Sequence, residues 1–173
     1  MADIFRKHPN GGGRIEDTAY VAETAYIGKH ASVLGNARVL DYARVHHHAT
    51  VSGDAVVSGN GMVFDDASIF GNAKVFDNAI VSGNAKVFED ASVFGNAMVV
   101  DNAGVFGNAT VFDSARVLGR ARIFGDAQVF GNALVCDNAL ITHKAKVCGH
   151  ARVYGDEHVC RTRPVTTVIV TNE

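Results

Sequence analysis

The chain lacks tryptophan, and its 173 residues include only two prolines and three cysteines. Cys136, Cys148 and Cys160 are spaced twelve residues apart, so in a three-sided coil of 18 residues they would point out of three different faces, too far apart to form a disulfide. No apolar run reaches the length of a transmembrane helix, and the N-terminus lacks the apolar region of a signal peptide. We therefore expect a cytoplasmic protein that has no membrane partner.

The chain also lacks an excess of charge of either sign. Lysine and arginine number 16 and aspartate and glutamate 18, which gives a formal net charge of −2. A chain with this balance has no general electrostatic attraction to nucleic acid. We expect no nucleic-acid partner.

A six-residue repeat is what the sequence does contain. From Ile15 to Val159 every sixth residue is Val or Ile, and from Ala19 to Ala151 the fourth residue after it is Ala, with Gly61 as the exception. In a strand, residues two apart share a face, so Ala-x-Val turns both of its small apolar residues inward. The pair between them is Gly or Asp followed by Asn or Asp, residues that tolerate positive φ and suit a corner. Each hexad therefore predicts one short strand and one corner.

Three hexads make a closed coil of 18 residues with its Val and Ala side chains inside. The predicted fold class is all-β, a single parallel β-helix in the form of a triangular prism with about eight coils and short terminal caps. The predicted divisions are an N-terminal cap at 1–14, the β-helix at 15–159 and a β-rich C-terminal tail at 160–173. Terminal caps are expected because a solenoid otherwise ends in unpaired strand edges.

An aliphatic residue at one position and a small residue four positions later is the pattern of hexapeptide-repeat proteins, which this chain resembles from Ile15 to Ala151. The resemblance implies a left-handed β-helix. Many members are acyltransferases, such as serine acetyltransferase and sugar acetyltransferases. For those the resemblance implies a histidine general base at a subunit interface, with coenzyme A or acetyl-coenzyme A bound between the prisms of a trimer. Such enzymes commonly carry a loop that interrupts the hexads, and here the hexads run without interruption.

Residues 18 apart are expected to stack, so the outward side chains fall into columns. One face carries two largely apolar columns, which predict an interface between copies of the chain. The interface residues predicted on this face are Met62, Phe64, Ile80, Met98, Val100 and Leu118. The other two faces are expected to carry stacked phenyl rings, at positions 70, 88, 106 and 124 and at positions 76, 94, 112 and 130.

His30, His48 and Asp66 are also 18 residues apart, so we expect them to stack at one corner. Stacked imidazole and carboxylate groups at one strand spacing suit metal ligands or a proton-transfer pair. These three residues are therefore the candidates for a catalytic or metal site. The alternative is that they are solvated corner residues.

The favoured functional hypothesis is a non-catalytic structural or interaction solenoid that self-associates, as a trimer, through the Met62, Ile80 and Met98 face. It needs no cofactor. One alternative is an acyltransferase of the hexapeptide class that uses coenzyme A or acetyl-coenzyme A. Another is a protein that sequesters a small molecule between protomers. The sequence leaves open whether the protein is an enzyme and identifies no substrate.

Overall fold

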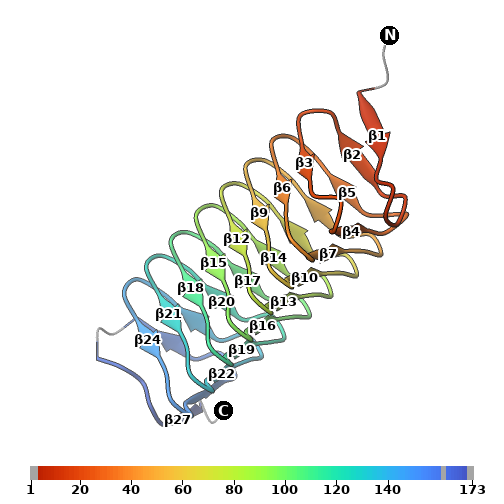
Figure 1. The fold of residues 1–173 in the computed structure, drawn as a ribbon. Helices are drawn as coiled ribbons and strands as arrows, with labels where there is room; N and C mark the ends of the chain where they lie inside the picture. Colours follow the sequence, from red (N-terminus) through yellow and green to blue (C-terminus); the bar gives the residue numbers. More distant parts are fainter. Residues whose placement is uncertain (1–3, 161–162, 171–173) are drawn as a thin grey trace.

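The computed structural model describes residues 4–160 and 163–170, and in these residues the regular elements are all β-strands (Figure 1). The parts of the predicted terminal segments at 1–3, 161–162 and 171–173 lie outside the described residues. Within the described part, the chain has no helix whose length and apolar character would allow it to cross a membrane.

The described strands form three sheets, numbered here by their order in the first coil. Sheet 1 contains β1 (Phe5–Lys7), β2 (Arg14–Glu16), β5 (Ser32–Val33), β8 (Thr50–Val51), β11 (Ser68–Ile69), β14 (Lys86–Val87), β17 (Gly104–Val105), β20 (Arg122–Ile123), β23 (Leu140–Ile141) and β26 (His158–Val159). Sheet 2 contains β3 (Tyr20–Val21), β6 (Arg38–Val39), β9 (Val56–Val57), β12 (Lys74–Val75), β15 (Ser92–Val93), β18 (Thr110–Val111), β21 (Gln128–Val129) and β24 (Lys146–Val147). Sheet 3 contains β4 (Tyr26–Ile27), β7 (Arg44–Val45), β10 (Met62–Val63), β13 (Ile80–Val81), β16 (Met98–Val99), β19 (Arg116–Val117), β22 (Leu134–Val135), β25 (Arg152–Tyr154) and β27 (Val168–Val170).

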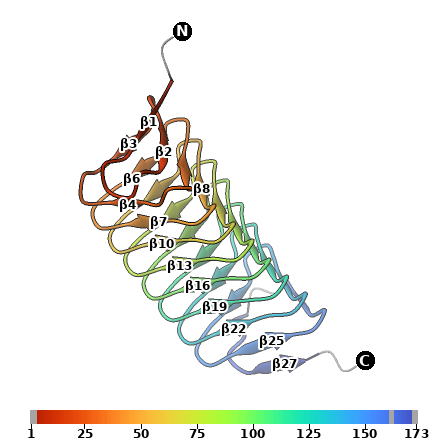
Figure 2. The same ribbon diagram turned by 90° about the vertical axis from the view of Figure 1, so that its right-hand side faces the viewer.

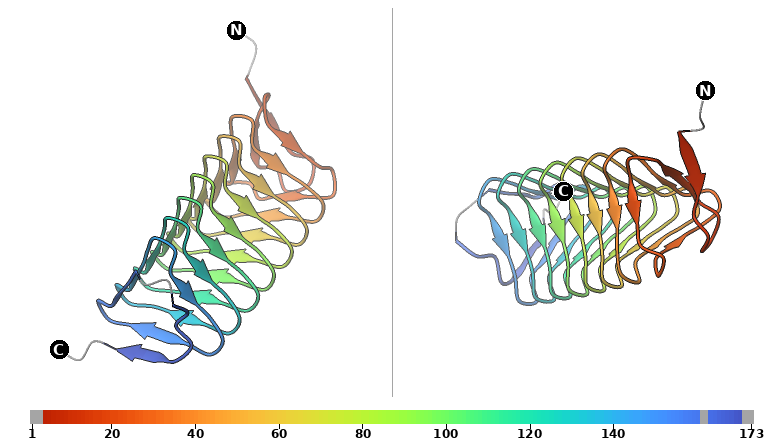
Figure 3. Two further views of the ribbon diagram at one scale, coloured as in Figure 1. Left: turned by 90° about the vertical axis from the view of Figure 1, so that its left-hand side faces the viewer. Right: turned by 45° about the horizontal axis from the view of Figure 1, so that its top comes forward.

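Each coil adds one strand to each sheet, in parallel and in the same register. Met62 is paired with Ile80, and Ile80 in turn with Met98, so equivalent residues are 18 positions apart. The coils lie one above another along the whole molecule (Figures 2 and 3). These features confirm the predicted fold class, a triangular parallel β-helix of about eight coils.

The interior is made from the two small apolar positions of each hexad. Val63 and Ala67 are fully buried, as are their counterparts through most of the prism. The Val or Ile of each hexad is β-branched, so it has few χ1 rotamers to lose on folding and packs well on a pleated sheet. One Val or Ile and one Ala from each of the three sides fill the narrow interior of a coil. Their burial holds the three sheets together.

The corners are stabilised by hydrogen bonds from one coil to the next. Asp77 has φ of 58°, and its carboxylate accepts a hydrogen bond from the Gly95 backbone N–H at 3.2 Å. At the neighbouring corner position, the Asn60 side-chain amide donates to Asn78 at 3.1 Å, and Asn78 donates to Asn96 at 3.2 Å. The Gly/Asp and Asn columns are therefore explained by the fold.

The two predicted phenylalanine ladders are confirmed. Their ring centroids are 4.8 to 5.0 Å apart and the rings are within 3° to 9° of parallel. Each ring covers a face of the next one, which removes apolar surface from water although the ladders lie on the outside of the prism.

Both ends of the chain add a strand to the stack. At the N-terminal end β1 pairs antiparallel with β2, and the Arg14 guanidinium lies 3.4 Å from the centroid of the Phe5 ring. Ile4 remains 60% exposed. At the C-terminal end β27 pairs parallel with β25 of the same chain, and Val165 forms a bridge with Val147. The described part of the tail thus packs on its own final coil.

A matched pair of glycine substitutions tests the corner conformation. Gly59 has φ of +65°, whereas Gly104 lies in a strand and an added Cβ would meet no atom closer than 3.9 Å. We expect Gly59→Ala to lower the free energy of unfolding by about 1–2 kcal/mol because Ala disfavours positive φ. We expect Gly104→Ala to raise it by about 0.5–1 kcal/mol because glycine weakens a strand. Urea denaturation followed by circular dichroism measures both, and equal effects would contradict the assignment of these two positions.

Candidate functional site

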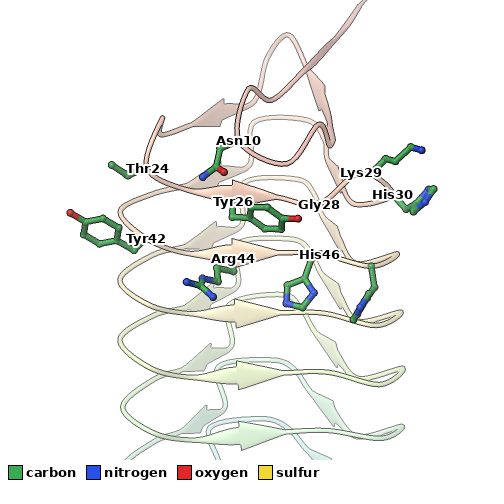
Figure 4. Close-up of a pocket in the computed structure, with 10 residues that line it drawn as sticks. Asn10, Thr24, Tyr26, Gly28, Lys29, His30, Tyr42, Arg44 and His46 are labelled. Atoms are coloured by element: carbon green, nitrogen blue, oxygen red, sulfur yellow. The ribbon is translucent and has the colours of Figure 1, made fainter.

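A recess of about 600 Å³ lies at the N-terminal end of sheet 3, over β4 and β7 (Figure 4). Tyr26 and Arg44 are paired neighbours in these strands, and both side chains point outward because Ile27 and Val45 next to them fill the core. This alternation follows from the strand repeat. Two neighbouring coils thus place an aromatic ring and a guanidinium side by side on the surface.

The N-terminal loop forms the upper rim of the recess. The Asn10 side-chain amide donates to the Ala25 carbonyl at 2.9 Å, and the Asn10 carbonyl accepts from the Ile27 N–H at 3.1 Å. The loop can approach β4 this closely because Gly11 has no side chain: a Cβ there would lie 2.3 Å from the Ile27 carbonyl oxygen. The predicted cap segment therefore also builds part of the site.

His46 lies on the floor of the recess. Its ring stacks on Phe64 with centroids 5.2 Å apart and planes 7° from parallel, and Tyr26 meets it edge-on at 6.4 Å. Gly28 occupies the equivalent place one coil earlier, where a Cβ would come within 2.8 Å of the His46 Cβ. The missing side chain leaves one face of the imidazole turned toward the recess.

Two corners close the sides of the recess. Thr24 and Tyr42 stand at the corner between sheets 2 and 3, while Lys29 and His30 stand at the corner between sheets 3 and 1, as Figure 4 shows. His47, which also lines the recess, has φ of 55° and lies with Nδ1 3.2 Å from the Asp65 carboxylate. Both partners of this pair are largely exposed, so it contributes little to stability.

The surroundings of His46 favour its neutral form. Burial lowers the pKa of His46 below 6.5, and the neighbouring His47 and Arg44 lower the pKa further, while Asp65 raises it. A neutral imidazole accepts hydrogen bonds and protons at physiological pH. His46 is therefore able to act as a hydrogen-bonding group or as a base.

The predicted corner site is only partly assembled. His30 and His48 stack with ring centroids 5.4 Å apart and planes 27° from parallel. Within the described residues, neither histidine is hydrogen-bonded to Asp66, and no group of three or more His, Cys, Asp or Glu side chains is arranged to hold a metal ion. The structure does not test a catalytic or metal-binding role of these three residues, which stays a prediction.

The residues predicted to form an interface share one face. Met62, Ile80 and Met98 are successive partners on β10, β13 and β16 of sheet 3, and each is half-buried. Phe64 and Val100 follow these strands and lie beside them, and Leu118 follows β19. We call the outward surface of β10, β13 and β16, together with Phe64, Val100 and Leu118, the apolar face.

Sequence comparison supplies no relative for this chain: no protein-family model matches it, and no curated protein matches it.

The pKa of His46 offers a direct test of the geometry of the recess. Because the Arg44 charge lowers this pKa and the Asp65 charge raises it, we expect Arg44→Ala to raise the pKa of His46 and Asp65→Asn to lower it further. Proton NMR titration of the imidazole Cε1–H resonances measures both changes. The matched control is Arg116→Ala, which removes the arginine at the equivalent position of β19, outside the lining of the recess, and should leave the titration unchanged.

Proposed function

We propose that the protein is a non-catalytic β-helix that self-associates through the apolar face, with a trimer as the expected assembly. The observation that carries the proposal is that the two outward columns of sheet 3 contain no charged residue between Arg44 and Arg116. In the same coils, sheet 2 carries Lys74 and sheet 1 carries Lys86. The apolar side chains of these columns are partly exposed in several adjacent coils, and a contiguous apolar patch on a folded protein is typical of an association site.

The shape of the apolar face suits a second copy of the same chain. The strands are in register from coil to coil, and the side chains on the face are half-buried by one another and leave few projecting groups. Ser82, in the centre, is buried between its neighbours. A face whose exposed atoms are mainly apolar can pack on its own image around a symmetry axis.

Charged groups surround the apolar face. Arg44 and Arg116 lie at its two ends, while Asp65 and Asp101 line one long edge and Asp77 lies on the other. A symmetric assembly can bring the arginines of one copy next to the edge carboxylates of another. Such a polar rim confers register and selects against wrong partners.

The resemblance to hexapeptide-repeat proteins supports the same proposal. It rests on the uninterrupted hexads and on the triangular β-helix that they form. We propose that this chain belongs to the hexapeptide-repeat family and that, like members of that family, it forms trimers of parallel prisms.

Introducing a charged side chain at the centre of the apolar face tests self-association. We expect the unchanged protein to sediment as an oligomer at micromolar concentration. Ile80→Lys, which places a charge between Met62 and Met98, should sediment as the 18.3 kDa monomer. Analytical ultracentrifugation measures the mass.

Ser92→Lys is the control, because it adds the same charge at the equivalent strand position of sheet 2. It should leave the oligomer intact, and circular dichroism should show that both variants are folded. A monomeric unchanged protein, or an Ile80→Lys variant of unchanged mass, would refute the proposal.

A second candidate function, acyl transfer, is favoured by one observation. His46 lies in a recess with its pKa lowered by burial, so it can take a proton from a hydroxyl or amine acceptor as that group attacks a thioester. The cofactor on this hypothesis is acetyl-coenzyme A, as in the acyltransferases that the sequence resembles.

Calorimetry separates the two candidates. Acyl transfer requires that acetyl-coenzyme A bind with a dissociation constant between micromolar and millimolar, and that His46→Ala abolish release of free coenzyme A in the presence of an acceptor. Absence of heat over this range excludes acyl transfer and leaves the self-association result untouched.

A further inference from the structure

The recess collects residues that depart from the repeat. Corner positions elsewhere in the prism are mostly Gly or Asp followed by Asn or Asp, and they are explained by hydrogen bonds between coils. In the first coils the same corner positions carry Lys29, His30, Tyr42 and His47, and all four line the recess. His46 likewise stands in a column whose later members carry no imidazole: Phe64, Ser82, Val100, Leu118, Cys136 and Tyr154. His47 keeps the corner hydrogen bond, because its Nδ1 accepts from the Asp65 N–H at 3.4 Å. Within the described residues, no such bond between coils accounts for the side chains of Lys29, His30 and Tyr42, yet these also converge on the recess.

The positive charge of the recess favours binding of an anionic ligand. Lys29 and Arg44 carry permanent positive charges, and three histidines add further donors. Among the described residues that line it there is no Asp or Glu, although the whole chain has a net charge of −2. The nearby carboxylate of Asp65 is paired with His47 and also accepts a hydrogen bond from the Gly83 N–H at 3.2 Å. The recess therefore presents positive charge that is not neutralised by its own lining.

The volume and the aromatic lining of the recess favour a ligand that contains a ring. Its volume of about 600 Å³ lies within the range of metabolite-sized sites. The Tyr26 and Tyr42 side chains are 38% and 67% exposed, and they are two of the four large apolar or aromatic side chains that the described residues leave exposed. Figure 4 shows Tyr26 above Arg44 and His46, with Tyr42 to one side. Exposed rings beside a cation offer a stacking surface for the flat or sugar part of a ligand.

We propose that this recess binds a phosphate monoester of a ring-bearing metabolite, with the phosphate against Arg44 and His46 and the ring against Tyr26 and Tyr42. A phosphate monoester fits better than a simple carboxylate because it presents three acceptor oxygens and a charge near −2 to the Arg44 guanidinium and the His46 imidazole, with the Lys29 charge on the rim of the same recess. The guanidinium fork of Arg44 can hold two of its oxygens at once. The Asn10 amide and the Thr24 hydroxyl on the rim provide donors and acceptors for hydroxyl groups on the ring. The proposal does not depend on self-association, because a single chain supplies all these residues.

The test measures binding to the full-length protein by isothermal titration calorimetry. The probes are AMP and glucose 6-phosphate, each compared with its uncharged counterpart, adenosine or glucose. We expect at least one phosphate monoester to bind with a dissociation constant below 1 mM and neither uncharged counterpart to bind. Arg44→Ala should weaken binding about tenfold or more, as loss of a charged hydrogen bond predicts. Arg44→Lys, which keeps the charge but lacks the fork, should give an intermediate loss.

Arg116→Ala is the matched control, because Arg116 occupies the same strand position on the same sheet and does not line the recess. It should bind the probe as the unchanged protein does, and so should Ile80→Lys, whose substitution lies on the apolar face. The proposal is wrong if neither phosphate monoester binds below 1 mM, or if the uncharged counterparts bind equally well. It is also wrong if Arg116→Ala or Ile80→Lys loses as much affinity as Arg44→Ala.

Discussion

The structure depends on one constraint, the match between an 18-residue coil and a core made only of Val, Ile, Ala and Gly. Because the sheets are parallel and in register, each side chain lies directly on its equivalent in the next coil. A larger inward residue in one coil would displace both neighbours, since a close-packed interior has no space to receive it. The same register stacks phenyl rings on phenyl rings and amides on amides, and it places a corner carboxylate next to the glycine N–H of the following coil.

This constraint explains why the fold was predictable from the sequence. The hexad period indicates which residues face inward, and a period-two strand with a corner leaves few ways to close the chain. The phenylalanine ladders and the asparagine corners followed from the spacing of 18 without further information. In a β-helix with a strict hexad repeat, the outward columns can therefore be predicted from the sequence as well as the core can.

The recess was not predictable in the same way. The coil register brings Tyr26, Arg44 and His46 together on sheet 3, but the upper rim of the recess depends on the loop around Gly11, which lies outside the repeat and folds back onto β4. No periodic signal specifies where such a loop packs. His46, His47 and His48 are consecutive in the sequence, but only His48 belongs to the corner column predicted as a site. In the structure His46 and His47 both line the recess, with ring centroids 4.7 Å apart, and His47 also lies beside Asp65, whereas His48 stacks on His30. A search for departures from the repeat would have found the recess residues.

The antiparallel strand β1 has a consequence for how molecules can join end to end. A parallel β-helix is in principle open-ended, because the last coil of one molecule offers the hydrogen-bonding edge that the first coil of another needs. Here β1 occupies the edge of sheet 1 with reversed polarity, and the Gly12–Gly28 bridge lies over β4 at the edge of sheet 3. An incoming coil would have to break these pairings on two of the three sheets before it could dock. The N-terminal segment thus blocks the addition of a further coil at the edges of sheets 1 and 3.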